Sequence, residues 1–144
     1  MSKRIYLASP FFNKFELDCV KRAEDILLGR GFELFSPRLN EVREDKDKNP
    51  ALWAQKTFEL DRENIDTADV VVMLYHGGYS DSGTAWECGY ARGKGIPVIA
   101  VHIDKNNDAN IMITQSCRAN ITLDELNGYD FDTLPKKSFD GDMF

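Results

Sequence analysis

The run DVVVMLY at residues 69–75 is apolar at every position after its aspartate. A short, continuously apolar run is typical of a strand buried on both faces of a parallel sheet. A similar run, IPVIAVHI at residues 96–103, follows the helical stretch DSGTAWECGYARGKG at residues 81–95. Strand, helix and strand in this succession predict a βαβ unit. The segment therefore predicts an α/β fold in which helices cover both faces of a parallel sheet.

The rest of the chain continues this alternation. Helix signals include Gly31 as a stop, and Asn49 as a cap before Pro50. We expect one domain over residues 1–144, a flavodoxin-like or Rossmann-like doubly wound sheet of about five parallel strands in the order 2-1-3-4-5. The expected strands are 3–9, 32–36, 69–75, 96–103 and 120–123, and the expected helices are 16–30, 50–68, 81–95, 111–117 and one from Asp124 onward.

Composition narrows the class of protein. The chain has 144 residues, 42% of them hydrophobic, which suits a single core. Its formal net charge of −6 disfavours nucleic acid or an anionic membrane as the main partner. No long apolar run predicts a membrane span or signal peptide, and three scattered cysteines fit the reducing cytoplasm. Dinucleotide and P-loop fingerprints and metal-ligand spacings are missing, so we expect neither cofactor nor metal.

Topology indicates where a site should lie. In such sheets, ligands bind beyond the carboxyl ends of the strands, where the winding reverses. That point brings together the loop after the first strand, which carries Phe11 and Phe12, and the loop that leads into residues 81–87. The two phenylalanines suit a planar ring, although filling the core is an equally good interpretation.

Acidic residues near this edge have both structural and chemical interpretations. Asp81 has the place of a helix N-cap, and Asp61 is one of several acids in its helix. Glu87 sits among small and apolar neighbours, either on a solvated face or at a pocket floor, with Tyr6 as a hydroxyl donor or a surface aromatic. Carboxylates that converge beside aromatic walls are the arrangement that cleaves glycosidic bonds.

Six segments in order resemble the nucleoside 2-deoxyribosyltransferase family. They are KRIYLASPFFN, LFSPRLN, FELDRENIDTADVVV, DSGTAWECGYARGKGIPVI, NIMITQS and YDFDTLPKKSFDGDMF. The resemblance implies that Glu87 is the nucleophile and that Tyr6 orients it. It implies that Asp61 and Asp81 contact the base and handle its proton. It also implies substrate contacts through an aromatic wall, a residue near the sugar and a pair at its 5′ end: Phe11 and Phe12, Asn40 or Glu41, and Asn110 with Met112.

The tail departs from the family pattern. Members often end in a tyrosine that enters a neighbouring subunit's site, whereas Phe144 stands there in this sequence. The resemblance implies a homo-oligomer, dimeric or hexameric, in which this tail lies between subunits. Phe144 retains the ring and loses the hydroxyl that would contact the nucleophile.

The resulting hypothesis is a cytoplasmic salvage enzyme that acts on 2′-deoxynucleosides and free nucleobases. It would transfer the deoxyribosyl group through a covalent intermediate on Glu87, with ping-pong kinetics and net retention. One alternative is a deoxynucleoside 5′-monophosphate N-glycosidase of the same fold, and another is a nucleotide-sensing domain without catalysis. The sequence leaves base preference open.

Overall fold

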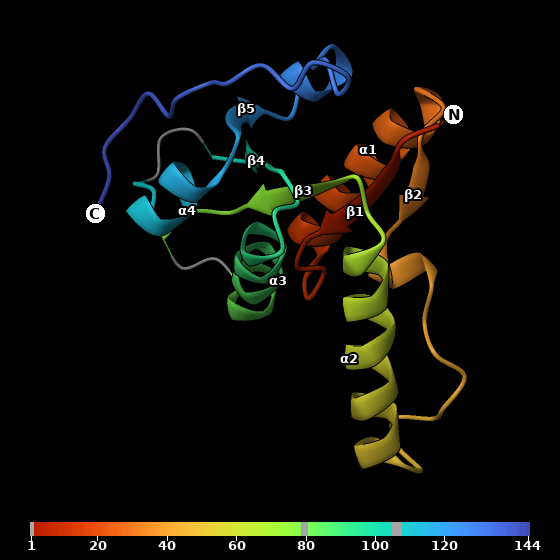
Figure 1. Cartoon of the computed structure of the whole chain (residues 1–144). Coiled ribbons are helices and arrows are strands. Elements are labelled where there is room, and N and C mark those ends of the chain that lie inside the picture. The colour runs from red at the N-terminus through yellow and green to blue at the C-terminus, as the bar shows by residue number, and fades with distance from the viewer. Residues whose placement is uncertain (1, 79–80, 105–107) are drawn as a thin grey trace.

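The computed structural model describes residues 2–78, 81–104 and 108–144 (Figure 1). The strands are β1 (Arg4–Ala8), β2 (Glu33–Phe35), β3 (Val70–Tyr75), β4 (Val98–His102) and β5 (Ala119–Thr122). The helices are α1 (Lys14–Gly29), α2 (Pro50–Asp66), α3 (Ser82–Gly93) and α4 (Ile111–Ser116), with short 3-10 turns η1 (Pro37–Leu39) and η2 (Glu125–Asn127).

The strands form one sheet in the order β2-β1-β3-β4-β5, and every pairing is parallel. The central strand β3 is buried at all its positions, which explains its unbroken apolar run. Its partners are β1, where Ile5 faces Val70, and β4, where Val98 faces Val71. The sheet confirms the predicted doubly wound fold and strand order.

Alternation along β1 divides the core into two layers. Ile5 and Leu7 belong to the apolar cluster that α1 and the segment after β5 cover. Tyr6 and Ala8 point the opposite way, into the cluster under α2 and α3. Because side chains of a strand alternate between faces, the position of Tyr6 in β1 places it on the α2–α3 side.

The predicted terminal helix from Asp124 is wrong. The chain makes only the short turn η2, and Tyr129 and Phe131 pack into the core beyond it. The Asp130 side chain accepts the backbone N–H groups of residues 132 and 133, at 2.9 and 3.2 Å. This local bonding competes with helix formation.

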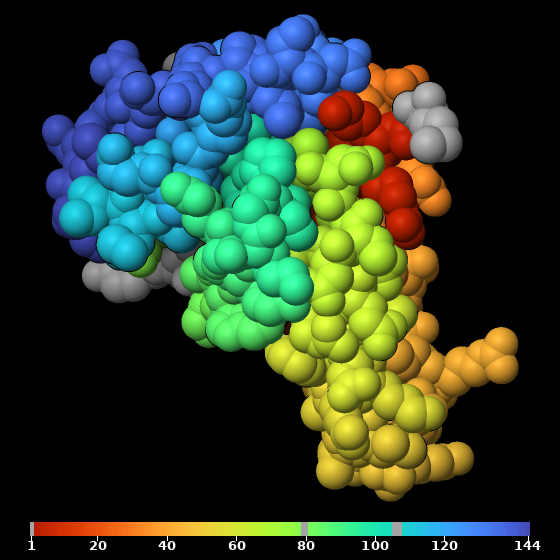
Figure 2. All heavy atoms as spheres, in the orientation of Figure 1, coloured from red at the N-terminus to blue at the C-terminus, as the bar shows by residue number. Residues whose placement is uncertain are grey.

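Helix α2 extends beyond the body of the molecule, and residues 40–49 run back along it (Figures 1 and 2). Asn49 caps it as predicted, accepting the Leu52 N–H at 3.2 Å. The Lys46 ammonium lies 4.9 Å from the ring centre of Trp53, which ties the loop to the helix. Within the described ranges, no helix has the length and apolar character needed to cross a membrane.

Candidate active site

A cleft of about 830 Å³ opens between α2, the start of α3 and the loops that follow β1 and β2. It therefore lies at the edge that topology predicts. Predicted site residues from four segments line it: Phe11, Phe12, Asn40, Glu41, Asp61, Asp81 and Glu87.

Tyr6 and Glu87 meet in the core beneath this cleft. Tyr6 is fully buried, and its hydroxyl donates a short hydrogen bond to the Oε2 atom of Glu87. Glu87 is in the second turn of α3, on the side that faces the sheet and the cleft. The alternatives in which Tyr6 reaches the surface and Glu87 lies on a solvated helix face are therefore wrong.

Burial dominates the electrostatics of Glu87. It raises the pKa of this carboxyl to about 8, and the negative charges of Asp61 and Asp81 add to the rise. The hydrogen bond from Tyr6 acts in the opposite direction, because it stabilises the carboxylate form. Burial and the Glu87 charge raise the pKa of the Tyr6 hydroxyl, so Tyr6 remains a donor.

Asp61 projects into the cleft from α2. It belongs to a stripe of cleft residues spaced four apart, Trp53, Thr57, Asp61 and Ile65, that covers one face of the helix. Burial raises the pKa of Asp61 to about 6. A carboxyl with this pKa exchanges a proton near neutral pH.

Asp81 caps α3 and also lines the cleft. Its Oδ2 atom accepts the Thr84 N–H at 2.8 Å and the Thr84 hydroxyl at 2.9 Å. The structural interpretation of Asp81 is thus confirmed. Both bonds use the same oxygen, so capping engages one of the two carboxylate oxygens.

Aromatic rings form much of the cleft wall. Phe11 and Phe12 have nearly parallel rings with centres 6.1 Å apart. Phe11 also packs against the core, whereas Phe12 is 78% exposed and offers a free ring face. The sequence did not identify three further aromatic residues of the cleft, Trp53, Phe58 and Trp86. Trp53 lies two four-residue steps before Asp61, on the same face of α2. The Trp86 and Phe58 ring centres are 5.3 Å apart.

Comparison with known proteins agrees with this geometry. The sequence model of the family described as "Nucleoside 2-deoxyribosyltransferase" matches residues 5–128. The chain belongs to this family. The match extends from β1 through η2, and therefore includes the whole sheet and all the carboxylates of the cleft.

Individual proteins that resemble this chain support the same family assignment. A nucleoside deoxyribosyltransferase of Lactobacillus johnsonii is 31% identical over 94 residues, which span 64% of this chain and 63% of that protein. The solved 2-deoxyribosyltransferase of Bacillus psychrosaccharolyticus is 38% identical, with a TM-score of 0.83 over 94% of this chain and 98% of that one. A CMP N-glycosidase of Clostridium botulinum shares the fold, at 18% identity and a TM-score of 0.53 over 99% and 89% of the two chains.

Three residues that the family resemblance assigns to the substrate lie outside the chain's own cleft. Asn110 caps α4 by accepting the Met112 N–H at 2.8 Å. Phe144 pairs with the same segment, and its carbonyl accepts the Ile111 N–H at 2.9 Å. The substrate roles of Asn110, Met112 and Phe144 in a nucleoside 2-deoxyribosyltransferase therefore stay predictions.

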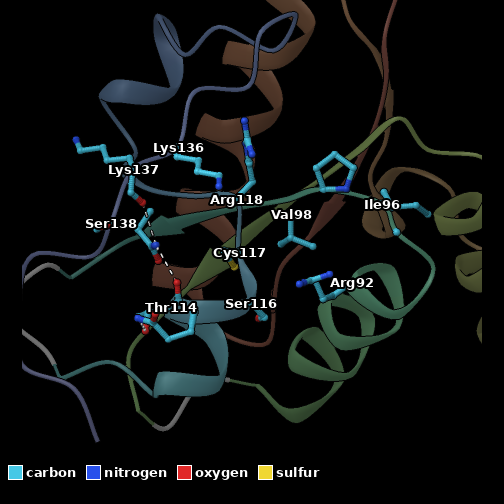
Figure 3. Close-up of a pocket in the computed structure, with 14 residues that line it drawn as sticks. Arg92, Ile96, Val98, Thr114, Ser116, Cys117, Arg118, Lys136, Lys137 and Ser138 are labelled. Atoms are coloured by element: carbon cyan, nitrogen blue, oxygen red, sulfur yellow. Dashed lines mark hydrogen bonds between the residues drawn. The ribbon is translucent and has the colours of Figure 1, made fainter.

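A second hollow, of about 470 Å³, opens where β4 begins (Figure 3). Its described lining residues include none of the cleft's carboxylates. The carboxyl ends of α3 and α4 border it, and Arg92 in the last turn of α3 offsets the partial negative charge of that helix end. Arg118 and Lys136 also line the hollow. Across the described parts of the chain, no group of three His, Cys, Asp or Glu side chains is arranged to hold a metal.

Proposed function

We propose that this chain transfers a 2-deoxyribosyl group between nucleobases through a covalent intermediate on Glu87. The observation that carries the proposal is the partly buried Tyr6–Glu87 hydrogen bond at the floor of a cleft that Asp61 and Asp81 also line. A buried carboxylate held by one donor, beside two further carboxylates, suits nucleophilic glycosyl chemistry.

In the first half-reaction, an oxygen of ionised Glu87 attacks C1′ of a 2′-deoxynucleoside. The C1′–N bond breaks, its electron pair goes to the base nitrogen, and an acid protonates the departing base. Asp61 suits this role, because its raised pKa of about 6 allows it to carry a proton near neutral pH. Asp81, whose Oδ2 already accepts two hydrogen bonds, suits orientation of the base.

In the second half-reaction, a nitrogen of the incoming base attacks C1′. The ester bond to Glu87 breaks, its electron pair returns to the carboxylate, and Asp61 takes the proton that the base loses. Two inversions give net retention. Phe12 and Trp86 would hold the planar base close to C1′, which favours transfer over attack by water.

We also propose that the enzyme works as a homo-oligomer in nucleoside salvage, with the tail at a neighbour's cleft. Asn110, Met112 and Phe144 lie outside their own cleft. Ile111, Met112, Met143 and Phe144 form an exposed apolar patch, which is typical of a contact surface. Such an arrangement would bring the predicted contacts at the 5′ end of the sugar to the site from the partner chain.

The rival hydrolase needs a cationic subsite for a 5′-phosphate. Among the described residues of the cleft, the cations are Lys46 and Arg62. Lys46 rests on Trp53, and Arg62 is paired with Asp66 at 2.7 Å. With these cations engaged and the neutral Asn110 as the predicted contact at the 5′ end, a 5′-hydroxyl suits the site better than a phosphate.

The decisive experiment incubates the protein with thymidine and adenine and follows 2′-deoxyadenosine and thymine by chromatography. We expect exchange, and we expect Glu87→Ala to lower its rate at least about a thousandfold. The control variant is Glu63→Ala, which removes an exposed acid from α2 and should leave the rate unchanged. Free deoxyribose without exchange, or cleavage of the monophosphate alone, would favour the hydrolase. Full activity of Glu87→Ala would refute the nucleophile.

A further inference from the structure

Glu24 of α1 is an acid that the proposed chemistry does not use, yet it is only 2% exposed. Its carboxylate accepts the Ser36 hydroxyl at 2.7 Å and the Arg38 Nε–H at 3.0 Å. A second nitrogen of Arg38, Nη2, bonds to the same oxygen as Nε. Glu24 thus holds two residues of the segment that follows β2 through three hydrogen bonds.

The segment that Glu24 holds forms one wall of the cleft. Pro37, Asn40 and Glu41 all line the cleft, and the Asn40 side chain donates to the Ser36 carbonyl at 3.0 Å. Ser36 is therefore bonded on one side to Glu24 and on the other to Asn40. The ion pair lies directly behind residues that the family resemblance places near the sugar.

Stability alone is a weak explanation for this pair. Removing two charges from water is costly, and well-packed apolar replacements of buried pairs are often neutral or stabilising. What the pair supplies is geometry, because two N–H groups of the Arg38 guanidinium converge on one oxygen of Glu24 while the Ser36 hydroxyl binds the other. An apolar contact would hold α1 against the segment without fixing its orientation.

We propose that Glu24 and Arg38 are positioning residues, whose ion pair sets where Asn40 and Glu41 stand in the cleft and thereby tightens substrate binding. This inference rests on the proposed transferase function for its kinetic part. Neither residue touches the reacting atoms, so loss of the pair acts on KM for the nucleoside more than on kcat.

The test compares Glu24→Leu/Arg38→Met with the wild-type protein and with Arg22→Gln/Asp124→Asn. The control pair also joins α1 to a distant segment, but its side chains are exposed and its partner lies at η2, away from the cleft. Three quantities are measured: the melting temperature, KM and kcat for thymidine, and amide hydrogen exchange of peptides that cover residues 36–41.

We expect the apolar pair to stay folded but to melt below the wild-type protein, because the buried Ser36 hydroxyl loses its acceptor. It should also exchange faster at residues 36–41 and raise KM at least about fivefold with kcat nearly unchanged. The control pair should change none of the three. Arg38→Lys keeps the charge and loses the two-pronged donor, so it should raise KM and exchange in the same direction.

Unchanged KM and unchanged exchange in a folded apolar pair would overturn the positioning role. So would an Arg38→Lys variant that matches the wild-type protein in both. Failure of the proposed function has a different signature, since the wild-type protein would then show no base exchange. In that case, hydrogen exchange at residues 36–41 still decides whether the pair positions the wall.

Discussion

At the scale of single residues, the Glu87 carboxyl is subject to two opposing effects. Burial raises its pKa to about 8, which disfavours the ionised form that attack on C1′ requires. The Tyr6 hydrogen bond lowers that pKa and fixes one carboxylate oxygen. The same dry environment strengthens interactions with the positive charge that develops on the sugar. In the proposed mechanism, the productive form would carry a proton on Asp61 and none on Glu87, although Glu87 has the higher pKa.

This distribution of protons predicts a bell-shaped dependence of kcat/KM on pH. Below about 6 both carboxyls hold protons, and above about 8 both are ionised, so the rate should peak near pH 7. Asp61→Asn removes the acid and its charge, and should leave a single rise with pH at a lower rate. Initial rates of base exchange at subsaturating thymidine measure this profile. An unchanged bell in Asp61→Asn would exclude Asp61 as the proton donor.

Single residues also mark the limit of what the sequence predicted. Asp81 and Glu87 were recognisable because they follow an apolar run whose end lies at the ligand-binding edge of the sheet. Asp61 is one of several acids in its helix, and only the family resemblance singled it out. The Glu24–Arg38 pair carries no such signal, because α1 and the segment after β2 meet only in the folded chain. Trp86 was missed because an aromatic residue in a packing helix is usually core.

At the scale of elements, the first turns of α3 carry both the cap that stabilises the helix and two carboxylates of the cleft. Asp81 satisfies an orphan N–H of the first turn and stands in the cleft with Glu87 one and a half turns later. The spacing of apolar residues in the sequence predicted nearly every helix and strand, because buried positions recur along each element. The segment after η2 escaped prediction, since the side-chain bonds of Asp130 decide its backbone.

Two substitutions at residue 81 separate capping from chemistry. Asp81→Ser keeps a capping oxygen and should retain stability, whereas Asp81→Ala should lose about 1 kcal/mol of unfolding free energy. If the carboxylate handles the base, both variants should lose base exchange about a hundredfold. Urea unfolding and the exchange assay measure the two effects. Full exchange by Asp81→Ser would make Asp81 a cap only.

At the scale of the whole molecule, the doubly wound sheet places the carboxylates, but the predicted contacts at the 5′ end of the sugar, Asn110 and Met112, lie outside their own cleft. The strand order followed from the alternation of strands and helices. The final positions of Asn110 and Phe144 did not, because the tail pairs with residues 109 and 111 rather than forming a helix. If a neighbouring chain supplies those contacts, each site takes the floor of its cleft from one subunit and the tail from another. A substitution in the floor and a deletion of the tail then affect one site from two different subunits.

Subunit complementation tests this arrangement. Glu87→Ala lacks the proposed nucleophile, and a chain that stops at Asp140 lacks the tail segment that pairs with Ala109. We expect each to be impaired alone. When the two are co-expressed in equal amounts, about a quarter of the sites should combine an intact Glu87 with a neighbour's intact tail. Base exchange should therefore recover to about a quarter of the wild-type rate.

In the matched control, a Glu87→Ala chain is co-expressed with a separate Asp61→Ala chain. Glu87 and Asp61 line the cleft of one chain, so no exchange of subunits restores both in the same site. This mixture should exchange bases no faster than the sum of the two variants measured separately, even though its oligomers form as readily. If the tail-deleted chain and Glu87→Ala together give only the sum of their separate rates, the tail acts within its own subunit. Recovery in the control pair would instead place Asp61 and Glu87 in different sites, against the geometry of the cleft.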